Sequence, residues 1–183
     1  QNEIYFDAAL WYIRACVEKG DFTSAESELK TLFKEKKFPA RLDKELAVVS
    51  ADFYVQKKDL INAEDKLLIA TKLIKRKRKK VRLNYILAQI YQYSNKHSLA
   101  QKHYELVLKS SPEYEMAFNA KMNLARSLEA GNPDTKKMKE TFLKMVKDDK
   151  NKEYLDQIYY TIAEMEISNN DTTSAIQNYT LST

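Results

Sequence analysis

A run of basic residues near the middle of the chain is the part of the sequence best suited to bind an anion. Eight of the 31 Lys and Arg residues fall between positions 72 and 82, and the other 23 are outnumbered by 26 Asp and Glu residues. The formal charge of +5 therefore comes from this run. Its centre, which we call the basic patch, consists of Lys75, Arg76, Lys77, Arg78, Lys79 and Lys80.

Three interpretations of the basic patch are open. The first is a solvated turn between two structural units. The second is a contact with an acidic protein or with anionic lipid head groups, where each Lys or Arg contributes about 1 kcal/mol near a charged surface. The third is nucleic acid, which is disfavoured because a basic run is a weak motif alone and no aromatic residues are interleaved for base stacking.

The residue types needed for catalysis or metal binding do not come together in the sequence. His97 and His103 have no Cys, Asp or Glu partner at ligand spacing, and no serine has a nucleophile-elbow sequence around it. Gly20 and Gly131, the only glycines, cannot form a phosphate-cradling loop. The single cysteine, Cys16, excludes a disulfide framework within the chain, and its apolar neighbours predict a buried thiol. We therefore expect no catalytic residue, no metal, no cofactor and no enzymatic activity.

The elements that must position any binding residue are helices. The chain has 183 residues but only 2 Gly and 3 Pro, so few turns can use positive φ and hairpin-rich β folds are disfavoured. Within Asn84–Pro112, Ala88 and Tyr91 place a small and an aromatic residue on one helical face. Ala100 and Tyr104 do the same on a second helix. The stretch predicts a helix–turn–helix unit that cannot bury its apolar face without neighbours of the same kind.

Two sets of small residues show that this unit recurs. The anchor of the second helix returns in steps of 37 or 38 residues at Ala25, Ala63, Ala100, Met138 and Ala175. The small residue of the first helix returns in the same steps at Ala51, Ala88, Ala125 and Ala163. Two independent anchors with one period predict about five units in a single domain. The predicted units cover residues 3–39, 40–79, 80–111, 112–150 and 151–183, the last one truncated.

The pattern of a long, a small and an aromatic residue, followed by A-x3-aromatic and a closing proline, resembles the tetratricopeptide repeat. The resemblance implies an all-α, right-handed α-α superhelical solenoid whose concave face is lined by the first helices. It also implies a scaffold for protein–protein interaction. The period exceeds the usual value of about 34 residues, so we expect slightly longer helices or turns. We also expect further helical structure after the last unit, because an uncapped final repeat exposes apolar surface.

Local signals predict how the helices begin and end. Gly20 is expected to end the first helix in the left-handed conformation. Thr23 and Glu26 are expected to form a capping box at the start of the second helix. Ser111-Pro112 predicts the cap and first turn of a later helix, and Gly131–Asp134 predicts a turn that is one residue longer than its counterparts.

Nine positions on the inner faces of the first helices, counted from the alanine anchors, form the candidate binding surface. Mixed aromatic, amide and charged residues on a concave surface suit a helix or an extended peptide, and the alternative is a solvated groove without a ligand. These positions do not reproduce the Lys/Asn clamp that chaperone-binding repeats use for a C-terminal carboxylate. Most of the 12 tyrosines are instead expected in the core. The candidate residues are Arg14, Asp52, Val55, Tyr85, Gln89, Tyr93, Arg126, Tyr160 and Glu164.

A narrower resemblance lies in Tyr5–Glu26 and Tyr114–Ala125, which are similar to the repeat region of the PorW/SprE family. The second stretch is the more specific, because the tetratricopeptide pattern does not dictate Asn119, Lys121 or Asn123. Members of this family are lipoproteins of the type IX secretion and gliding-motility machinery. The resemblance implies a periplasmic, outer-membrane-tethered scaffold whose partners are other proteins, namely secretion-machinery subunits.

The membrane attachment that this resemblance implies is an N-terminal lipid on a cysteine that follows a signal peptide. The sequence lacks that region, since Cys16 lies inside a predicted helix, and we expect the chain to be a segment of a longer protein. No run of about 18 apolar residues predicts a membrane span. The alternative function is a cytoplasmic repeat regulator that binds a peptide or nucleic acid.

Overall fold

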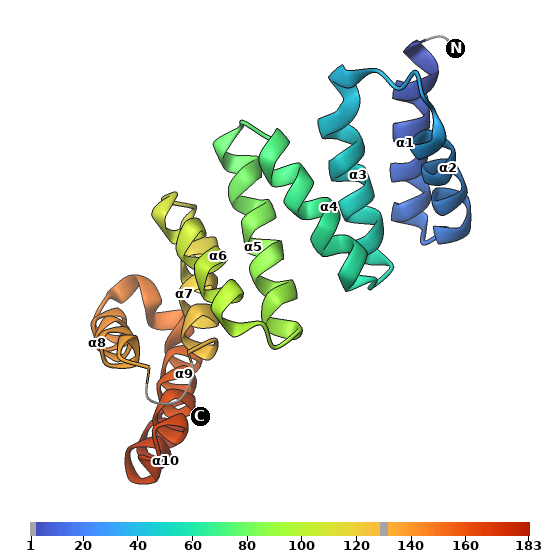
Figure 1. The fold of residues 1–183 in the computed structure, drawn as a ribbon. Coiled ribbons are helices and arrows are strands. Elements are labelled where there is room, and N and C mark those ends of the chain that lie inside the picture. The colour runs from blue at the N-terminus through green and yellow to red at the C-terminus, as the bar shows by residue number, and fades with distance from the viewer. Residues whose placement is uncertain (1–2, 129–131) are drawn as a thin grey trace. The chain divides into compact units, whose positions relative to one another are not determined.

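The computed structural model describes residues 3–128 and 132–183. In this part of the chain the regular elements are helices, joined by short connections (Figure 1). No strand occurs in these two ranges, which confirms the all-α prediction. The elements are α1 (Glu3–Lys19), α2 (Phe22–Lys34), η1 (Ala40–Leu42), α3 (Asp43–Gln56), α4 (Leu60–Leu73), α5 (Lys77–Tyr93), α6 (His97–Lys109), α7 (Tyr114–Arg126), α8 (Asp134–Val146), η2 (Asp149–Tyr154), α9 (Leu155–Ser168) and α10 (Thr172–Leu181).

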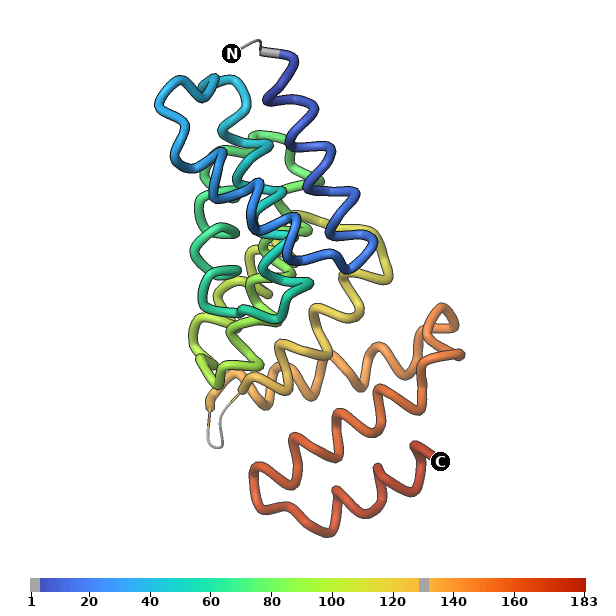
Figure 2. The backbone as a smooth tube through the Cα atoms, turned by 90° about the vertical axis from the view of Figure 1, so that its right-hand side faces the viewer, coloured from blue at the N-terminus to red at the C-terminus, as the bar shows by residue number. Residues whose placement is uncertain are grey.

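The helices form consecutive pairs, and the chain divides into two compact units, Gln1–Leu83 and Asn84–Thr183, with the boundary inside α5 (Lys77–Tyr93). Figure 2 shows the pairing clearly for α1 with α2 and for α9 with α10, each of which folds back as a hairpin. Each predicted repeat contains one such pair, except that α5 begins at Lys77, a few residues before position 80. The assignment of all five repeats to a single domain stays a prediction.

The alanine anchors are buried in the structure. A methyl side chain lets two helix backbones approach, and the larger residues around it fill the remaining space. The anchors of the second helices that are fully buried are Ala25, Ala63, Ala100 and Ala175, and the buried anchors of the first helices are Ala51, Ala88, Ala125 and Ala163. The half-buried Met138 replaces alanine in α8 and packs against the core that α7 and α9 share. The predicted packing role of these residues is confirmed.

The same turn geometry joins the two helices of the pair in four of the five pairs. Gly20, Lys58, Asn95 and Asn170 have positive φ values between 55° and 74°. In each case the next residue donates its N–H to the carbonyl five residues back, as Asp21 does to Cys16 at 2.9 Å. This is the Schellman ending of a helix, in which the left-handed residue lets the chain reverse at once. The prediction for Gly20 is confirmed, and the recurrence aligns the four pairs residue by residue.

The predicted capping box at Thr23 is wrong. Because the chain reverses at Gly20, α2 already begins at Phe22, and Thr23 falls inside its first turn. Asp21 is the cap, and its side chain accepts a hydrogen bond from the Ser24 N–H at 3.1 Å. Glu26 instead accepts hydrogen bonds from Lys57 and Lys30, which lower the pKa of its carboxyl to about 2. The side chains of Asp59 and Asp171 cap α4 and α10 in the same way as Asp21 caps α2.

The predicted cap at Ser111-Pro112 is also wrong. Ser111 has a φ of 49° and belongs to the ending of α6, where its N–H bonds to the Leu108 carbonyl. α7 begins only at Tyr114, after Glu113, without a side-chain cap. Of the turn predicted at Gly131–Asp134, Gly131 lies outside the described residues, and Asp134 begins α8.

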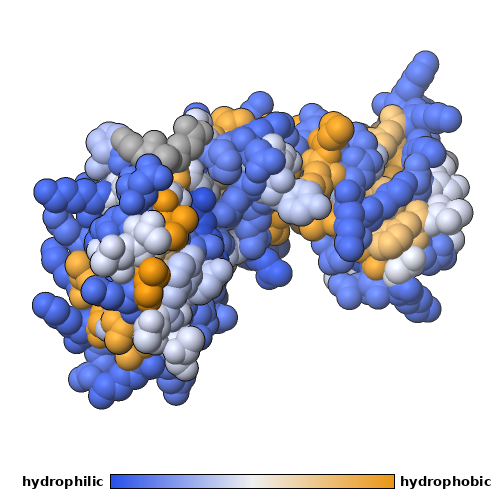
Figure 3. Space-filling model, turned by 90° about the horizontal axis from the view of Figure 1, so that it is seen from below, coloured by the Kyte–Doolittle hydropathy of each residue, from blue (hydrophilic) through white to orange (hydrophobic). Residues whose placement is uncertain are grey.

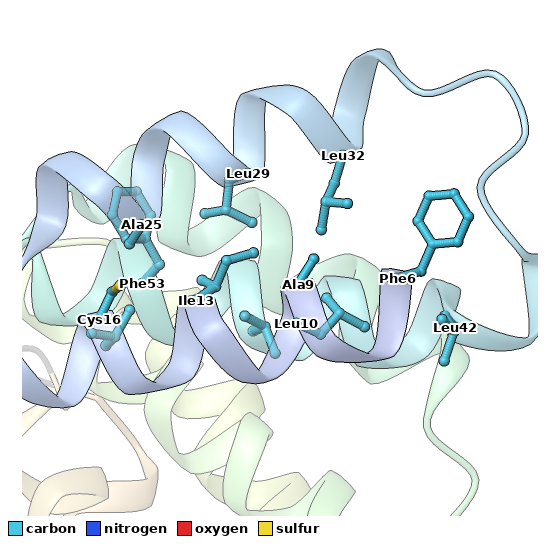
Figure 4. Packing of buried hydrophobic residues seen from close by; sticks show 12 residues of the cluster. Phe6, Ala9, Leu10, Ile13, Cys16, Ala25, Leu29, Leu32, Leu42 and Phe53 are labelled. Atoms are coloured by element: carbon cyan, nitrogen blue, oxygen red, sulfur yellow. The ribbon is translucent and has the colours of Figure 1, made fainter. Parts of the chain in front are cut away.

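The core of the first unit forms where α1, α2 and α3 meet. Figure 4 shows side chains of α1 and α2 pointing toward one another, with Phe53 of α3 and Leu42 of η1 beside them. Cys16 is buried in this cluster, as predicted. The cluster comprises Phe6, Ala9, Leu10, Ile13, Cys16, Val17, Ala25, Leu29, Leu32, Leu42, Val49 and Phe53.

Most tyrosines lie outside the core, contrary to the prediction. Among the described residues only Tyr91 and Tyr104 are buried. Tyr104 donates from its hydroxyl to the Gln92 side-chain oxygen at 2.7 Å, and burial raises the pKa of that hydroxyl. A phenol needs a hydrogen-bond partner when it is buried, and Gln92 supplies one for Tyr104.

A buried carboxylate replaces the aromatic residue in the last pair. Glu166 occupies the position that Tyr91 holds in α5, and its side chain is 4% exposed. Lys139 of α8 forms an ion pair with one oxygen at 2.5 Å, and Asn178 of α10 donates to the other at 2.9 Å. A buried charge must be paired to be tolerated. Glu166 therefore ties α8, α9 and α10 together through polar contacts.

The anchor packing predicts that Ala88→Leu destabilises the fold. Ala88 is fully buried, and added methylene groups must displace neighbours at a helix crossing, at a cost of about 1–3 kcal/mol. Thermal unfolding followed by circular dichroism should show a lower melting temperature. Gln89→Leu, at the exposed next position, is the matched control. An Ala88→Leu variant as stable as this control would contradict the assigned register.

The setting of His103 predicts a pH-dependent stability. Its Nδ1 donates to the Asn84 side-chain oxygen at 2.9 Å. Burial, and then the nearby Lys102, lower the pKa of its imidazole from 6.5. The unfolded chain therefore takes up a proton first, so His103 should reduce stability as the pH falls below 6.5. In urea unfolding between about pH 7.5 and 5.5, the free energy of unfolding should depend less steeply on pH for His103→Gln than for the wild type. Equal slopes for wild type and His103→Gln would contradict this prediction.

Candidate functional site

Three of the nine predicted binding residues lie in the unit Gln1–Leu83. The Arg14 guanidinium stacks over the Trp11 ring at 4.8 Å from its centroid. Asp52 of α3 lies near Arg14, and partial removal from water, then Glu18, raise the pKa of its carboxyl while Arg14 lowers it. Val55 is half-buried one turn further along α3. Arg14 and Asp52 thus lie near each other, with opposite charge, on neighbouring first helices.

Three more predicted residues lie on α5, in the unit Asn84–Thr183. The half-buried Tyr85 accepts a hydrogen bond at its hydroxyl from the Asn123 side chain of α7 at 3.2 Å. Its ring also meets the Tyr104 ring edge to face. Gln89 and Tyr93 are exposed on the same helix. Tyr85 is therefore held in place from α6 and α7, while the other two side chains remain open to a partner.

The remaining three predicted residues lie on α7 and α9. Arg126 Nε donates to a carboxylate oxygen of Glu164 at 3.1 Å, and another guanidinium nitrogen donates to the Thr161 hydroxyl at 3.4 Å. Tyr160 meets the Tyr179 ring of α10 edge to face, with centroids 5.4 Å apart. The structure thus brings Arg126 and Glu164 together and turns Tyr160 toward the second helix of its own pair.

A cavity of about 130 Å³ opens beside the Arg126–Glu164 pair. Its wall includes the Thr135 hydroxyl, which is buried and has no hydrogen-bond partner among the described residues. A cavity of this size can hold several waters or one side chain of a ligand. It is lined by Ala125, Arg126, Leu128, Thr135, Thr161, Glu164, Met165, Ser168 and Asn169, from α7, α8 and α9 and the segments that follow α7 and α9.

The sequence missed four residues that shape these surfaces. The Trp11 ring contacts Arg14, and the Thr161 hydroxyl accepts a hydrogen bond from Arg126. The Asn123 side chain donates to the Tyr85 hydroxyl, and Thr135 lines the cavity. Only Asn123 carried a signal, because it was among the residues that the repeat pattern does not dictate. The others come into place through contacts between helices. Binding by any of the nine predicted residues stays a prediction.

The basic patch lies partly in a connection and partly in a helix. Lys75 and Arg76 follow α4, whereas Lys77–Lys80 form the first turn of α5, and all six side chains are exposed. No acidic residue occurs in that turn. The positive end of the helix dipole therefore coincides with four cations, an arrangement that disfavours the helix start.

Two absences hold for the part of the chain that the structure describes. Its His, Cys, Asp and Glu side chains form no group of three or more that could hold a metal ion. None of its helices combines the length and the apolar character needed to cross a membrane.

The charge at the start of α5 predicts that Lys77→Glu with Lys79→Glu raises the melting temperature at low ionic strength. Each favourable charge in a first helical turn contributes about 0.3–1 kcal/mol, and salt screens the effect. The difference in melting temperature between the double variant and the wild type should therefore shrink in high salt. Lys34→Glu, in the last turn of α2, should instead lower the melting temperature at low ionic strength. A double variant no more stable than the wild type at low salt would contradict the electrostatic account of α5.

Comparison with known proteins identifies the architecture. No protein-family model matches the chain, and neither does any curated protein sequence. Among solved structures, MamA MSR-1 is similar at 15% identity and a TM-score of 0.65, with 98% of this chain and 94% of that one covered.

Two further structures support the same architecture. MamA AMB-1 gives 15% identity and a TM-score of 0.65, over 98% of this chain and 96% of that one. The apo form of RapI is similar at 16% identity and a TM-score of 0.72. The match covers 100% of this chain and 54% of RapI, so the chain spans about half of that protein. Identities this low show the fold alone, and the paired helices are those of a tetratricopeptide-like repeat solenoid.

Proposed function

We propose that the chain is a non-enzymatic scaffold that binds another protein at the Arg126–Glu164 face of the unit Asn84–Thr183. The tetratricopeptide-like fold is one that presents surfaces to protein partners generally. The observation that carries the specific proposal is the cavity beside Arg126, with the partnerless Thr135 hydroxyl in its wall.

The chemistry of this face suits a peptide segment. The guanidinium of Arg126 has five N–H donors, of which Glu164 and Thr161 engage two nitrogens. The remaining donors can bond to backbone carbonyls or to a carboxylate of a ligand. The Thr135 hydroxyl can complete a hydrogen bond with a polar side chain that enters the cavity. Tyr93 and Gln89, exposed on α5, supply an aromatic and an amide group for the rest of the segment.

The partner we propose is a subunit of a type IX secretion or gliding apparatus at the outer membrane. This finer proposal rests on the sequence resemblance of Tyr114–Ala125 to the PorW/SprE family. That stretch forms most of α7, the helix that contributes Arg126 to the site. The proposed location is periplasmic, with tethering to the outer membrane through an N-terminal lipid outside this segment. The alternative, a cytoplasmic regulator that binds a peptide or nucleic acid, is an outcome of the test.

The proposal is tested by capture of purified outer-membrane ring and translocon subunits on the immobilised chain. We expect at least one subunit to bind more strongly than it binds an unrelated repeat protein. Arg126→Met should weaken that binding about tenfold to a hundredfold, because a charge-assisted hydrogen bond is worth about 1.5–3 kcal/mol. Thr135→Val should also weaken binding while keeping or raising the melting temperature, since it removes a buried, partnerless hydroxyl.

The controls separate the site from the partner. Lys102→Met changes an exposed cation on α6, away from the first-helix face, and should leave binding unchanged. Capture of a subunit that is insensitive to Arg126→Met and Thr135→Val would refute the site. Absence of any enrichment would refute the secretion-machinery partner, and preferential binding of nucleic acid would support the alternative function.

A further inference from the structure

The basic patch is a surface feature of the unit Gln1–Leu83 that the proposed binding face does not include. All six of its side chains are exposed. The residues directly before and after it, Ile74 and Val81, are buried among the apolar residues of the core. Two buried side chains therefore anchor the backbone of this segment, and the charges are presented to solvent from a fixed place in the fold.

The stretch around the patch contains positive charge only. The residues that flank the patch, Lys72 and Arg82, are exposed as well. Residues 72–82 contain eight Lys and Arg residues and no acidic residue. Along the chain, no Asp or Glu occurs between Asp65 and Glu105. The stretch therefore carries a formal charge of +8 that no acidic residue of the same stretch offsets.

Other first helices show that folding does not require these cations. The first turns of α3, α7 and α9 each contain an acidic residue, namely Asp43, Glu115 and Asp156. A negative charge at that place stabilises a helix start. The first turn of α5 contains none and carries four cations instead. Residues that oppose the local structure are expected at functional surfaces, where another interaction compensates for their cost.

The excess of charge belongs to one end of the unit Gln1–Leu83. Figure 1 shows the connection from α4 to α5 at the end opposite to the turns inside the two helix pairs of this unit. Around those turns, residues 18–21 and 57–59 contain three basic and three acidic residues. Figure 3 is seen from below, the side of these turns, and shows hydrophilic residues with separate apolar patches among them. Charge, and not hydropathy, therefore distinguishes the end that bears the patch.

Exposed apolar side chains adjoin the patch on the last turns of α4. Leu73 is 41% exposed, and Ile69, on the same face one turn earlier, is 39% exposed. Lys and Arg beside exposed Leu and Ile are typical of segments that rest at a bilayer surface, where cations meet phosphates and apolar side chains reach the acyl chains. A nucleic acid offers the charge without the apolar layer. An acidic protein would need both kinds of group in one fixed geometry, whereas a bilayer offers both everywhere.

We propose that the basic patch, together with Leu73 and Ile69, docks on the surface of a bilayer that contains anionic phospholipid. Lysine suits this partner because its ammonium group is a point charge on a flexible chain and needs no fixed geometry with any one phosphate. Each Lys or Arg near such a surface changes the binding constant about fivefold. Salt screens this attraction, and only two apolar side chains accompany it. Binding should therefore be reversible and should depend on anionic lipid and on ionic strength.

The test is co-sedimentation of the chain with vesicles of phosphatidylcholine alone and of phosphatidylcholine mixed with phosphatidylglycerol. We expect binding to the mixed vesicles at low salt, much weaker binding at high salt, and none to phosphatidylcholine alone. Removal of four patch charges should weaken binding at least about a hundredfold. The fold should survive, because these cations disfavour the start of α5, and circular dichroism checks this. The variant combines Lys75→Gln, Arg76→Gln, Lys77→Gln and Lys79→Gln.

A matched variant removes the same net charge elsewhere and should keep most of the wild-type binding. Its four positions are exposed on α8 and directly after it. Equal loss of binding in the two variants would mean attraction by net charge alone and would overturn the assignment to the patch. The matched variant combines Lys136→Gln, Lys137→Gln, Lys144→Gln and Lys147→Gln.

Tryptophan emission tests whether the apolar side chains reach the lipid. Trp11→Phe removes the only tryptophan, and Leu73→Trp in that background should emit at shorter wavelength when mixed vesicles are added. Ile61→Trp, at the start of the same helix and 84% exposed at present, should keep its emission. Poly-glutamate and double-stranded DNA, as soluble polyanions, should not shift the emission of Leu73→Trp.

Three further results would overturn the proposal. They are absence of binding to mixed vesicles at low salt, an unchanged Leu73→Trp emission on bound vesicles, and tighter binding of poly-glutamate or DNA than of the vesicles. The last result would assign the patch to an acidic protein or to a nucleic acid. The inference does not depend on the Arg126–Glu164 face, because Arg126→Met should leave vesicle binding unchanged and the four-charge patch variant should leave capture of a protein partner unchanged.

Discussion

Close approach of paired helices at buried alanines is the constraint on which the rest of this structure depends. Ala63 and Ala51 in one pair, and Ala100 and Ala88 in the next, have no exposed surface or almost none. Where side chains this small meet, helix backbones can lie near each other, and each larger neighbour then has one place to go. The burial of the flanking Leu and aromatic residues follows from that spacing.

The same constraint fixes which residues of successive first helices face each other. Within each of the two units, the same position of two neighbouring first helices comes together. Arg126 and Glu164 meet for this reason, and Arg14 lies near enough to Asp52 to lower the pKa of its carboxyl. Such half-exposed pairs add little stability, typically below about 1 kcal/mol. Their effect is on register and on the charge pattern that the surface offers to a partner.

In the last two helix pairs, buried polar groups replace apolar side chains at some positions between the helices. Glu166 stands where α5 has Tyr91 and is satisfied by Lys139 and Asn178. Nearby, Thr135 is left without a partner in the cavity wall. The packed core of α7, α8 and α9 therefore contains both a completed polar network and an incomplete one. An incomplete network beside a cavity is where a ligand group gains most, because it removes an existing desolvation cost.

The sequence alone determined the helical class, the period and the packing role of the alanines, because these depend on local spacing that every unit repeats. It also placed Gly20 in the left-handed turn. It misplaced the caps at Thr23 and Ser111, because a one-residue shift in where the chain reverses decides which side chain precedes the helix. It placed too many tyrosines in the core, because repeat position does not reveal whether a hydroxyl finds a partner. The Arg126–Glu164 contact, the cavity beside it and the exposure of Trp11 were decided by tertiary structure, since each depends on which helix, if any, lies across from the residue.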